Sequence, residues 1–198
     1  MKYFYASRSP ILLGQQIRPW GFGTQCQPQI AQVRPLLLGP TPQLAIDQGS
    51  GVQDLNPVLV IEVVFEDVRL AEFAGRPSRW DSVHLFELEA DAVEFALKYP
   101  PRPYIYEVSV SDAELVLRAD QILVNEGANT QADPLTEINQ MRDRARKYWS
   151  GHLTRNSFIE VLVPAGQASL GRLVRLLDRR ISVPTGQSLP TREARPIS

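Results

Sequence analysis

The chain has 198 residues, of which 43% are hydrophobic and 22% charged, and its formal net charge at pH 7 is −1. This length and composition are typical of one globular domain with its own core, and the small net charge argues against a general nucleic-acid or membrane binder. A single cysteine, Cys26, and two histidines exclude an intramolecular disulfide and the ligand cluster of a structural zinc site, so we expect a cytoplasmic domain without metal.

The first quarter of the chain predicts one strand followed by a long irregular segment. Tyr3–Ser7 is short and rich in aromatic residues, and the turn at Arg8-Ser9-Pro10 ends it. Residues 11–51 are rich in Pro, Gly and Gln and are expected to lie irregularly on the surface, where loops of this length often carry function. Cys26 lies in this segment without an adjacent base, so it is predicted to be inert.

Residues 56–98 predict two helices and a strand. Asn56-Pro57 places an N-cap residue before a proline at the first helical position, which predicts a helix over Val58–Phe73 that ends at Gly75. The β-branched residues of 58–65 keep a strand open as an alternative there. The next three segments are predicted to be a turn, a strand and a short helix: 76–79, Val83–Phe86 and Ala90–Lys98.

The second half of the chain contains the clearest strand, Tyr104–Val110, in which side chains alternate. Asp133-Pro134 predicts a helix start, and Phe158–Val163 predicts a strand that Pro164 ends. Because strands and helices are mixed without strict β–α–β alternation, we expect an α+β domain over residues 1–183. Three weaker predictions complete the chain: strand pieces at 114–117 and 121–124, a helix or a strand at 170–180, and a disordered tail at 184–198.

Three segments, taken in order, resemble the ADP-ribosyltransferase superfamily, which includes pertussis-like toxins, rifampicin-modifying transferases and DarT-type toxins. They are YFYASRSP at 3–10 with IRPWGF at 17–22, SRWDSVHLF at 78–86 with YIYEV at 104–108, and NSFIEVLVP at 156–164. The resemblance implies an α+β fold in which two small sheets form a split β-sandwich with flanking helices. It also implies that NAD is the substrate.

Glu160 is the catalytic residue that the resemblance implies, because NSFIEVLVP matches the strand that carries the family's essential glutamate. Cleavage of the nicotinamide–ribose bond builds positive charge on the ribose, and a carboxylate beside the ribose stabilises that charge. Asp120 is an alternative acid, since rifampicin-type transferases place theirs soon after the YIYEV strand. The sequence around Glu160 is closer to the family pattern.

The resemblance further implies that five residues bind NAD. Tyr5 occupies the position of the first-strand His, Ser7 that of a Thr, and Arg8 that of a neighbouring Lys. Arg8 and Arg79 are candidates to hold the diphosphate. His84 occupies the position of an aromatic residue that stacks on nicotinamide. Tyr5 and His84 depart from the family's usual residues, and packing in the core is the alternative role for each.

The function implied is NAD-dependent mono-ADP-ribosyl transfer to an unknown protein or nucleic acid, as a toxin, effector or defence enzyme with an antitoxin or immunity protein as partner. Water or a drug are alternative acceptors. The departures at Tyr5 and His84 favour a second hypothesis, a catalytically degenerate module that binds NAD or another nucleotide.

The acceptor is less well defined by the sequence. The basic stretch 142–147, followed by Tyr148 and Trp149, would suit a nucleic acid, although a solvated helix face and burial of Trp149 are the simpler interpretation. No run of about 18 apolar residues is present, so we expect no membrane-spanning helix and no membrane partner.

Overall fold

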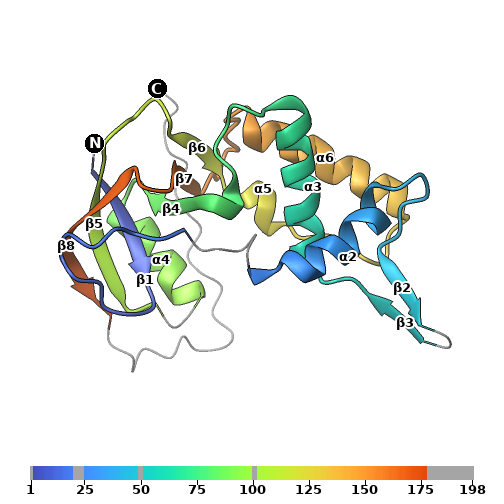
Figure 1. Cartoon of the computed structure of the whole chain (residues 1–198), viewed down its shortest axis with the longest axis horizontal. Helices are drawn as coiled ribbons and strands as arrows, with labels where there is room; N and C mark the ends of the chain where they lie inside the picture. Colours follow the sequence, from blue (N-terminus) through green and yellow to red (C-terminus); the bar gives the residue numbers. More distant parts are fainter. Residues whose placement is uncertain (1, 20–24, 49–50, 100–101, 178–198) are drawn as a thin grey trace.

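The computed structural model of the chain describes residues 2–19, 25–48, 51–99 and 102–177 (Figure 1). Strands and helices are mixed, so the α+β class predicted from the sequence is confirmed. The elements in chain order are β1 (Lys2–Ser7), α2 (Gln27–Leu38), β2 (Ala45–Gln48), β3 (Gly51–Asp54), α3 (Pro57–Glu72), the 3-10 helix η1 (Arg79–Asp81), β4 (Ser82–Phe86), α4 (Glu89–Lys98), β5 (Tyr104–Val110), β6 (Leu117–Asp120), α5 (Ile122–Asn125), α6 (Pro134–Trp149), β7 (Ile159–Pro164) and β8 (Ala168–Leu176).

Six strands form one antiparallel sheet in the order β6-β7-β4-β1-β5-β8, and β2 and β3 form a separate hairpin. The central pairing, between β1 and β4, is limited to Phe4 opposite Phe86. By contrast, β1 pairs with β5 along its whole length, and β4 pairs with β7 in the same way. The sheet therefore consists of two three-stranded halves that join at one residue pair. We call this junction the seam.

The seam alters one expectation from the sequence. Two separate small sheets were expected to form a sandwich, whereas the two halves observed share the Phe4–Phe86 pairing and count as one sheet. The only other sheet among the described residues is the hairpin β2-β3, which projects from the helical side of the molecule (Figure 1).

Helix α3 begins where its sequence predicts. The Asn56 side chain accepts hydrogen bonds from the backbone N–H groups of Val58 and Leu59 at 3.0 and 3.4 Å, and Pro57 occupies the first turn. The strand alternative for residues 58–65 is therefore wrong. The apolar residues of α3 pack against α2 and α6, which lie beside it in Figure 1, and the Trp149 indole N–H donates to the Phe65 carbonyl at 2.8 Å. This bond fixes α6 against α3, and it confirms the core role expected of Trp149.

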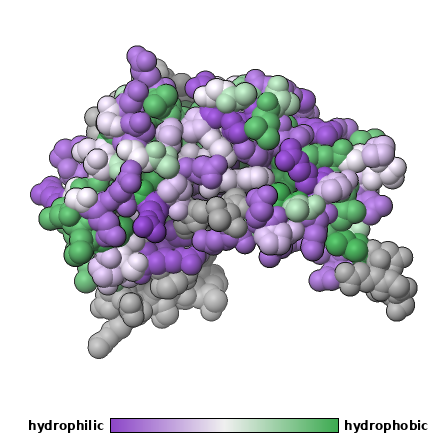
Figure 2. All heavy atoms as spheres, in the orientation of Figure 1, coloured by the Kyte–Doolittle hydropathy of each residue, from purple (hydrophilic) through white to green (hydrophobic). Residues whose placement is uncertain are grey.

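The two faces of the sheet pack differently. One face carries its own cluster of strand residues, among them Val83, Leu85 and Val161. On the other face, α4 packs against β1, β4 and β5 through Phe95 and Phe86, whose ring centroids are 5.0 Å apart. Outside these clusters, Figure 2 shows a face on which hydrophilic residues predominate and apolar residues lie in small, separate groups.

Several predictions for irregular or weakly patterned segments are wrong. Residues 11–51 contain α2 and β2, which were missed because α2 has an internal proline, Pro35, and no side-chain N-cap. Residues 121–124 are not a strand, because α5 begins at Ile122, where the Asp120 carboxylate accepts the backbone N–H. The strand expected at 114–117 begins only at Leu117, as β6.

The described residues end at 177, so only part of the C-terminal predictions can be compared with the structure. Of the two alternatives for 170–180, the strand is correct as far as Leu176. Residues 178–180 and the tail 184–198 lie outside the described residues. No helix in the described part of the chain is long and apolar enough to cross a membrane.

Candidate functional site

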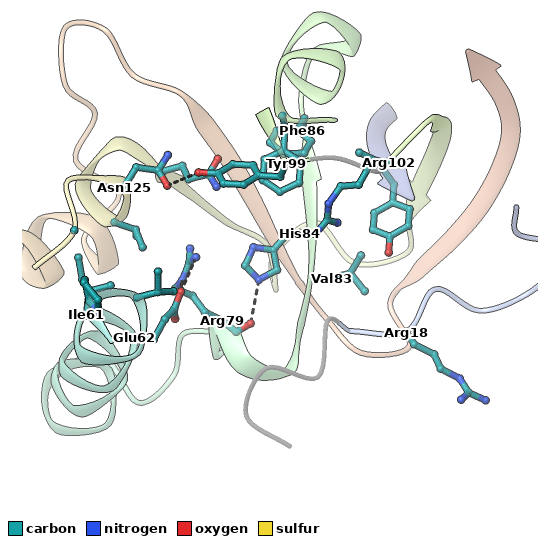
Figure 3. A pocket seen from close by; sticks show the side chains of 18 residues that line it. Arg18, Ile61, Glu62, Arg79, Val83, His84, Phe86, Tyr99, Arg102 and Asn125 are labelled. Atoms are coloured by element: carbon teal, nitrogen blue, oxygen red, sulfur yellow. Dashed lines mark hydrogen bonds and ion pairs between the residues drawn. The ribbon is translucent and has the colours of Figure 1, made fainter. Parts of the chain in front are cut away.

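A cavity of about 240 Å³ lies at the seam of the sheet (Figure 3). Tyr5 and Ala6 line it from β1, and Val83, His84 and Phe86 line it from β4, so both halves of the sheet contribute. The remaining walls come from α3, η1, α4, α5 and the segments that flank these helices, and from Arg18. The incomplete pairing of β1 with β4 thus leaves room for a pocket where a continuous sheet would be closed.

His84 and Glu160 meet behind this cavity because of the register of β4 and β7. Phe86 lies opposite Glu160 and His84 lies opposite Leu162, so alternation of side chains places His84 and Glu160 on one face as diagonal neighbours. His84 Nδ1 is 2.8 Å from Glu160 Oε2. His84 lines the cavity, whereas Glu160 is only 1% exposed. The cavity therefore reaches Glu160 through His84.

Arg79 holds the other oxygen of Glu160. It lies in η1, which begins at Ser78, whose hydroxyl accepts from the Trp80 N–H at 3.1 Å and donates to Glu66 on α3 at 3.1 Å. The Arg79 guanidinium donates to Glu160 Oε1 and also to both oxygens of Glu62 on α3, at 3.1–3.2 Å. Helix α3 and strand β7 are thereby joined by one buried arginine.

Tyr148 completes the hydrogen bonds of this buried group. Its hydroxyl donates to Glu160 Oε1 at 2.7 Å and accepts from Arg79 Nη1 at 2.7 Å. The Tyr148 side chain is fully buried, and burial raises the pKa of the phenol well above its ordinary value. We refer to Glu62, Arg79, His84, Tyr148 and Glu160 as the carboxylate cluster.

Glu160 is ionised at neutral pH. Burial alone would raise its pKa, but Arg79, His84 and Tyr148 outweigh burial and lower the pKa to about 2. Burial likewise favours the neutral form of Arg79, yet Glu160 and Glu62 raise its pKa well above the ordinary value. The cluster therefore places two carboxylates around one guanidinium, an arrangement with a surplus of negative charge when His84 is neutral.

The two ring nitrogens of His84 both face oxygen acceptors. Nδ1 faces Glu160 Oε2 at 2.8 Å, and Nε2 lies 3.0 Å from the backbone carbonyl of Arg79 (Figure 3). A neutral imidazole can donate through only one nitrogen, whereas the imidazolium donates through both. A proton on His84 would also balance the charges of the cluster.

The acid stability of the protein should report on this cluster. The pKa of Glu160 falls from 4.5 to about 2 on folding, so between these pH values the unfolded chain binds a proton that the folded chain does not. Its contribution of about 3 kcal/mol is present above pH 4.5 and is lost as the pH falls towards 2. Urea unfolding of wild type and Glu160→Gln across this range measures it. A wild-type advantage that stays constant with pH would contradict the assignment.

The other residues implied by the family resemblance are less uniformly placed. Tyr5 lines the cavity, and burial raises the pKa of its phenol. Ser7 is used locally, because its hydroxyl donates to the Ser9 carbonyl at 2.7 Å, and it is not among the lining residues. Arg8 is exposed, but it lies near enough to Tyr5 to lower the pKa of that phenol against the effect of burial. Arg79 lines the cavity, but it binds carboxylates.

Asp120, the alternative acid, is a structural residue. It is fully buried, and its oxygens accept from the backbone N–H groups of Ile122, Thr154 and Phe158 at 2.9–3.1 Å and from the Thr154 hydroxyl at 2.6 Å. These donors fasten β6, α5 and the loop before β7 together. Asp120 is not among the lining residues of the cavity.

We expect Asp120→Asn to lower the free energy of unfolding by about 3 kcal/mol, because an amide nitrogen cannot accept from the donors that now bind one carboxylate oxygen. Chemical denaturation measures this loss. Activity per folded molecule should stay at the wild-type level, and a selective loss of activity in a stable Asp120→Asn protein would return Asp120 to the catalytic candidates.

Two arginines of the basic stretch of α6 pair with carboxylates of the protein itself. Arg146 pairs with Glu72 and Asp143, and Arg144 pairs with Glu126 and Glu137. The two aromatic residues that follow are fully buried, Tyr148 in the carboxylate cluster and Trp149 against α3. They are therefore not available to stack on bases.

Three residues of the site were missed in the sequence. Glu62 carried a usable signal, because it stands with Glu66, one helical turn apart, in the otherwise apolar run of α3. Tyr148 carried none, since its contact with Arg79 connects residues 69 positions apart, and Arg102, which also lines the cavity, carried none either. Within the part of the chain that the structure describes, no group of three His, Cys, Asp or Glu side chains is arranged to hold a metal ion.

Comparison with known families shows the family of this chain but gives no reaction for it. Residues 50–169, more than half of the chain, match the model of the family described as protein of unknown function DUF2441. The chain belongs to the DUF2441 family. No curated protein matches it significantly. The matched region of this DUF2441 protein includes Glu62, Arg79, His84, Tyr148 and Glu160, so the whole carboxylate cluster lies within the family's domain.

Proposed function

We propose that the DUF2441 protein is a mono-ADP-ribosyltransferase that binds NAD⁺ in the seam cavity. The observation that carries this proposal is the convergence of Tyr5, His84 and Glu160, from β1, β4 and β7, on one cavity and the ionised carboxylate behind it. These are the positions to which the family resemblance assigns NAD binding and catalysis. The resemblance leads us to expect two sheets around the site, and the observed sheet has two halves that join at one residue pair there.

The carboxylate cluster has the charge that this reaction needs. When the bond between ribose C1′ and the nicotinamide nitrogen breaks, its electron pair stays on the nitrogen and positive charge develops on the ribose. Glu160 and Glu62 surround a single guanidinium and, being buried, act on that charge with little screening by water. The negative surplus of the cluster stabilises the cationic ribose.

His84 completes the reaction. The acceptor's lone pair forms a new bond to C1′, and the acceptor releases one proton. His84 lines the cavity and has Glu160 at 2.8 Å, so once its Nε2 turns from the Arg79 carbonyl to the acceptor it accepts that proton as an imidazolium paired with the carboxylate. The products are ADP-ribosylated acceptor and nicotinamide. A protein or nucleic acid is the proposed acceptor, and water or a drug would use the same steps.

A second function is favoured by one specific observation. Glu160 is only 1% exposed, and Arg79, Tyr148 and His84 already occupy its oxygens. A ribose hydroxyl reaches the carboxylate only if His84 moves aside. A protein in which His84 stays in place would bind NAD or another nucleotide without turning it over.

Nicotinamide release from NAD⁺ tests the proposal, first with water and then with cell protein and nucleic acid as acceptors. Binding is measured in parallel by thermal shift, where a ligand at 100 times its dissociation constant stabilises the folded state by about 2.7 kcal/mol. Release together with stabilisation supports the transferase. Stabilisation without release under any acceptor condition supports the binding module, and absence of both would refute the two functions.

A further inference from the structure

A second charged region lies in the same cavity, on the side of His84 away from Glu62 and Arg79 (Figure 3). It is centred on Arg102, which lines the cavity just before β5 and is 5% exposed. Its guanidinium carbon lies 5.0 Å from the ring centroid of Phe95, so an aromatic face supports the charged group. Arginine is seldom buried to this extent without a role for its charge.

Among the described residues, Arg8 is a second cation that acts on Arg102. The pKa of the Arg102 guanidinium is lowered to about 10. Burial is the largest cause, the charge of Arg8 adds to it, and Tyr5 has a smaller opposing effect. Arg8 is exposed and is not among the residues that line the cavity, so it adds positive charge from outside to the Arg102 end, while the other end carries a surplus of carboxylate. An anion bound there would relieve the repulsion between the arginines.

We propose that Arg102 is the centre of a phosphate subsite, which takes the diphosphate of the dinucleotide, with Arg8 adding positive charge from outside the cavity. The identity of the dinucleotide rests on the proposed function, but the anion subsite does not. The planar fork of Arg102 can donate two parallel hydrogen bonds to phosphate oxygens. Arg79, which the sequence suggested for this role, is committed to Glu62 and Glu160.

The subsite determines how a dinucleotide would be oriented in the cavity. A cavity of about 240 Å³ is smaller than the roughly 300–1,000 Å³ of pockets for drug-sized ligands, so it holds only part of a dinucleotide. With the diphosphate at Arg102, the adjoining ribose and its cationic nicotinamide extend past His84 towards the carboxylates. The adenosine half then lies towards the outside.

Isothermal titration calorimetry with inorganic diphosphate, ADP-ribose and adenosine tests the subsite on the full chain. We expect diphosphate and ADP-ribose to bind, adenosine to bind much more weakly, and Arg102→Gln to weaken the first two about 10- to 100-fold, as expected for losing charge-assisted hydrogen bonds. Arg8→Gln should weaken them less, because Arg8 is exposed. Arg146→Gln, on the surface of α6, is the matched control and should bind as wild type does.

Arg102→Lys keeps the inference testable if Arg102→Gln fails to fold. Lysine retains the charge but not the fork, so we expect binding several-fold weaker than wild type. Wild-type affinity for diphosphate in either Arg102 variant would overturn the subsite, as would a wild-type protein that binds neither diphosphate nor ADP-ribose. Arg102-dependent diphosphate binding in a protein that never releases nicotinamide would leave the subsite standing and refute the transferase.

Discussion

Glu160→Gln is expected to lower the rate of nicotinamide release from NAD⁺ by about 10²- to 10³-fold, the range seen when one preorganised electrostatic group is removed from an active site. Glutamine has nearly the same shape as glutamate, so the cavity and the β4–β7 register should be retained. What changes is the charge, since the cluster becomes one carboxylate facing one guanidinium and no longer favours a cationic ribose. Steady-state release measured under saturating NAD⁺ isolates this effect from binding.

Two further variants separate charge from packing at this position. Tyr148→Phe removes the hydroxyl that donates to Glu160 at 2.7 Å but leaves the carboxylate, so its loss of rate should be much smaller. Asp143→Asn removes an exposed carboxylate on α6 that pairs only with its neighbour on the same helix among the described contacts, and it should release nicotinamide at the wild-type rate. Because Glu160→Gln also weakens the fold, each rate is normalised to the folded fraction. Wild-type release by folded Glu160→Gln would exclude Glu160 as the catalytic carboxylate.

Much of the fold could be predicted from local sequence. The caps at Asn56 and Asp133, each followed by proline, place the starts of α3 and α6, because the signal and its physical cause lie in the same few residues. The alternating stretch at Tyr104–Val110 places β5 for the same reason. Helix α2 escaped prediction because Pro35 lies inside it and its stability comes from packing of Ile30, Val33 and Leu37.

The site was predicted only at the level of single residues. The resemblance to ADP-ribosyltransferases selects His84 and Glu160, and the pairing of β4 with β7 brings them together. The amino-acid sequence does not reveal that Arg79 binds Glu160, since this contact depends on where η1 lies relative to α3. Nor does it reveal the seam, because β1 and β4 are far apart in the chain and the extent of their pairing depends on the twist of both halves.

Arg79→Met is expected to lower the free energy of unfolding by about 3–5 kcal/mol, the usual cost of removing one partner of a buried ion pair. The change leaves Glu62 and Glu160 buried without the guanidinium that now binds both, while methionine fills much of the same volume. Urea denaturation at pH 7 measures the loss. Arg146→Met is the control, because its ion pairs with Glu72 and Asp143 are about half exposed, and it should cost roughly 1 kcal/mol or less.

A double-mutant cycle shows whether the lower stability of Arg79→Met comes from buried carboxylates left without a counter-charge. In Arg79→Met the pKa of a remaining carboxylate should rise, since desolvation is no longer opposed by Arg79, and a protonated carboxyl is tolerated in the interior. The deficit relative to wild type should therefore shrink as the pH falls from 7 to 5. Adding Glu160→Gln to Arg79→Met should cost much less than Glu160→Gln alone, because the charge it removes is already unpaired. Additive losses with no dependence on pH would mean that Arg79 stabilises the fold through packing and not through the carboxylates.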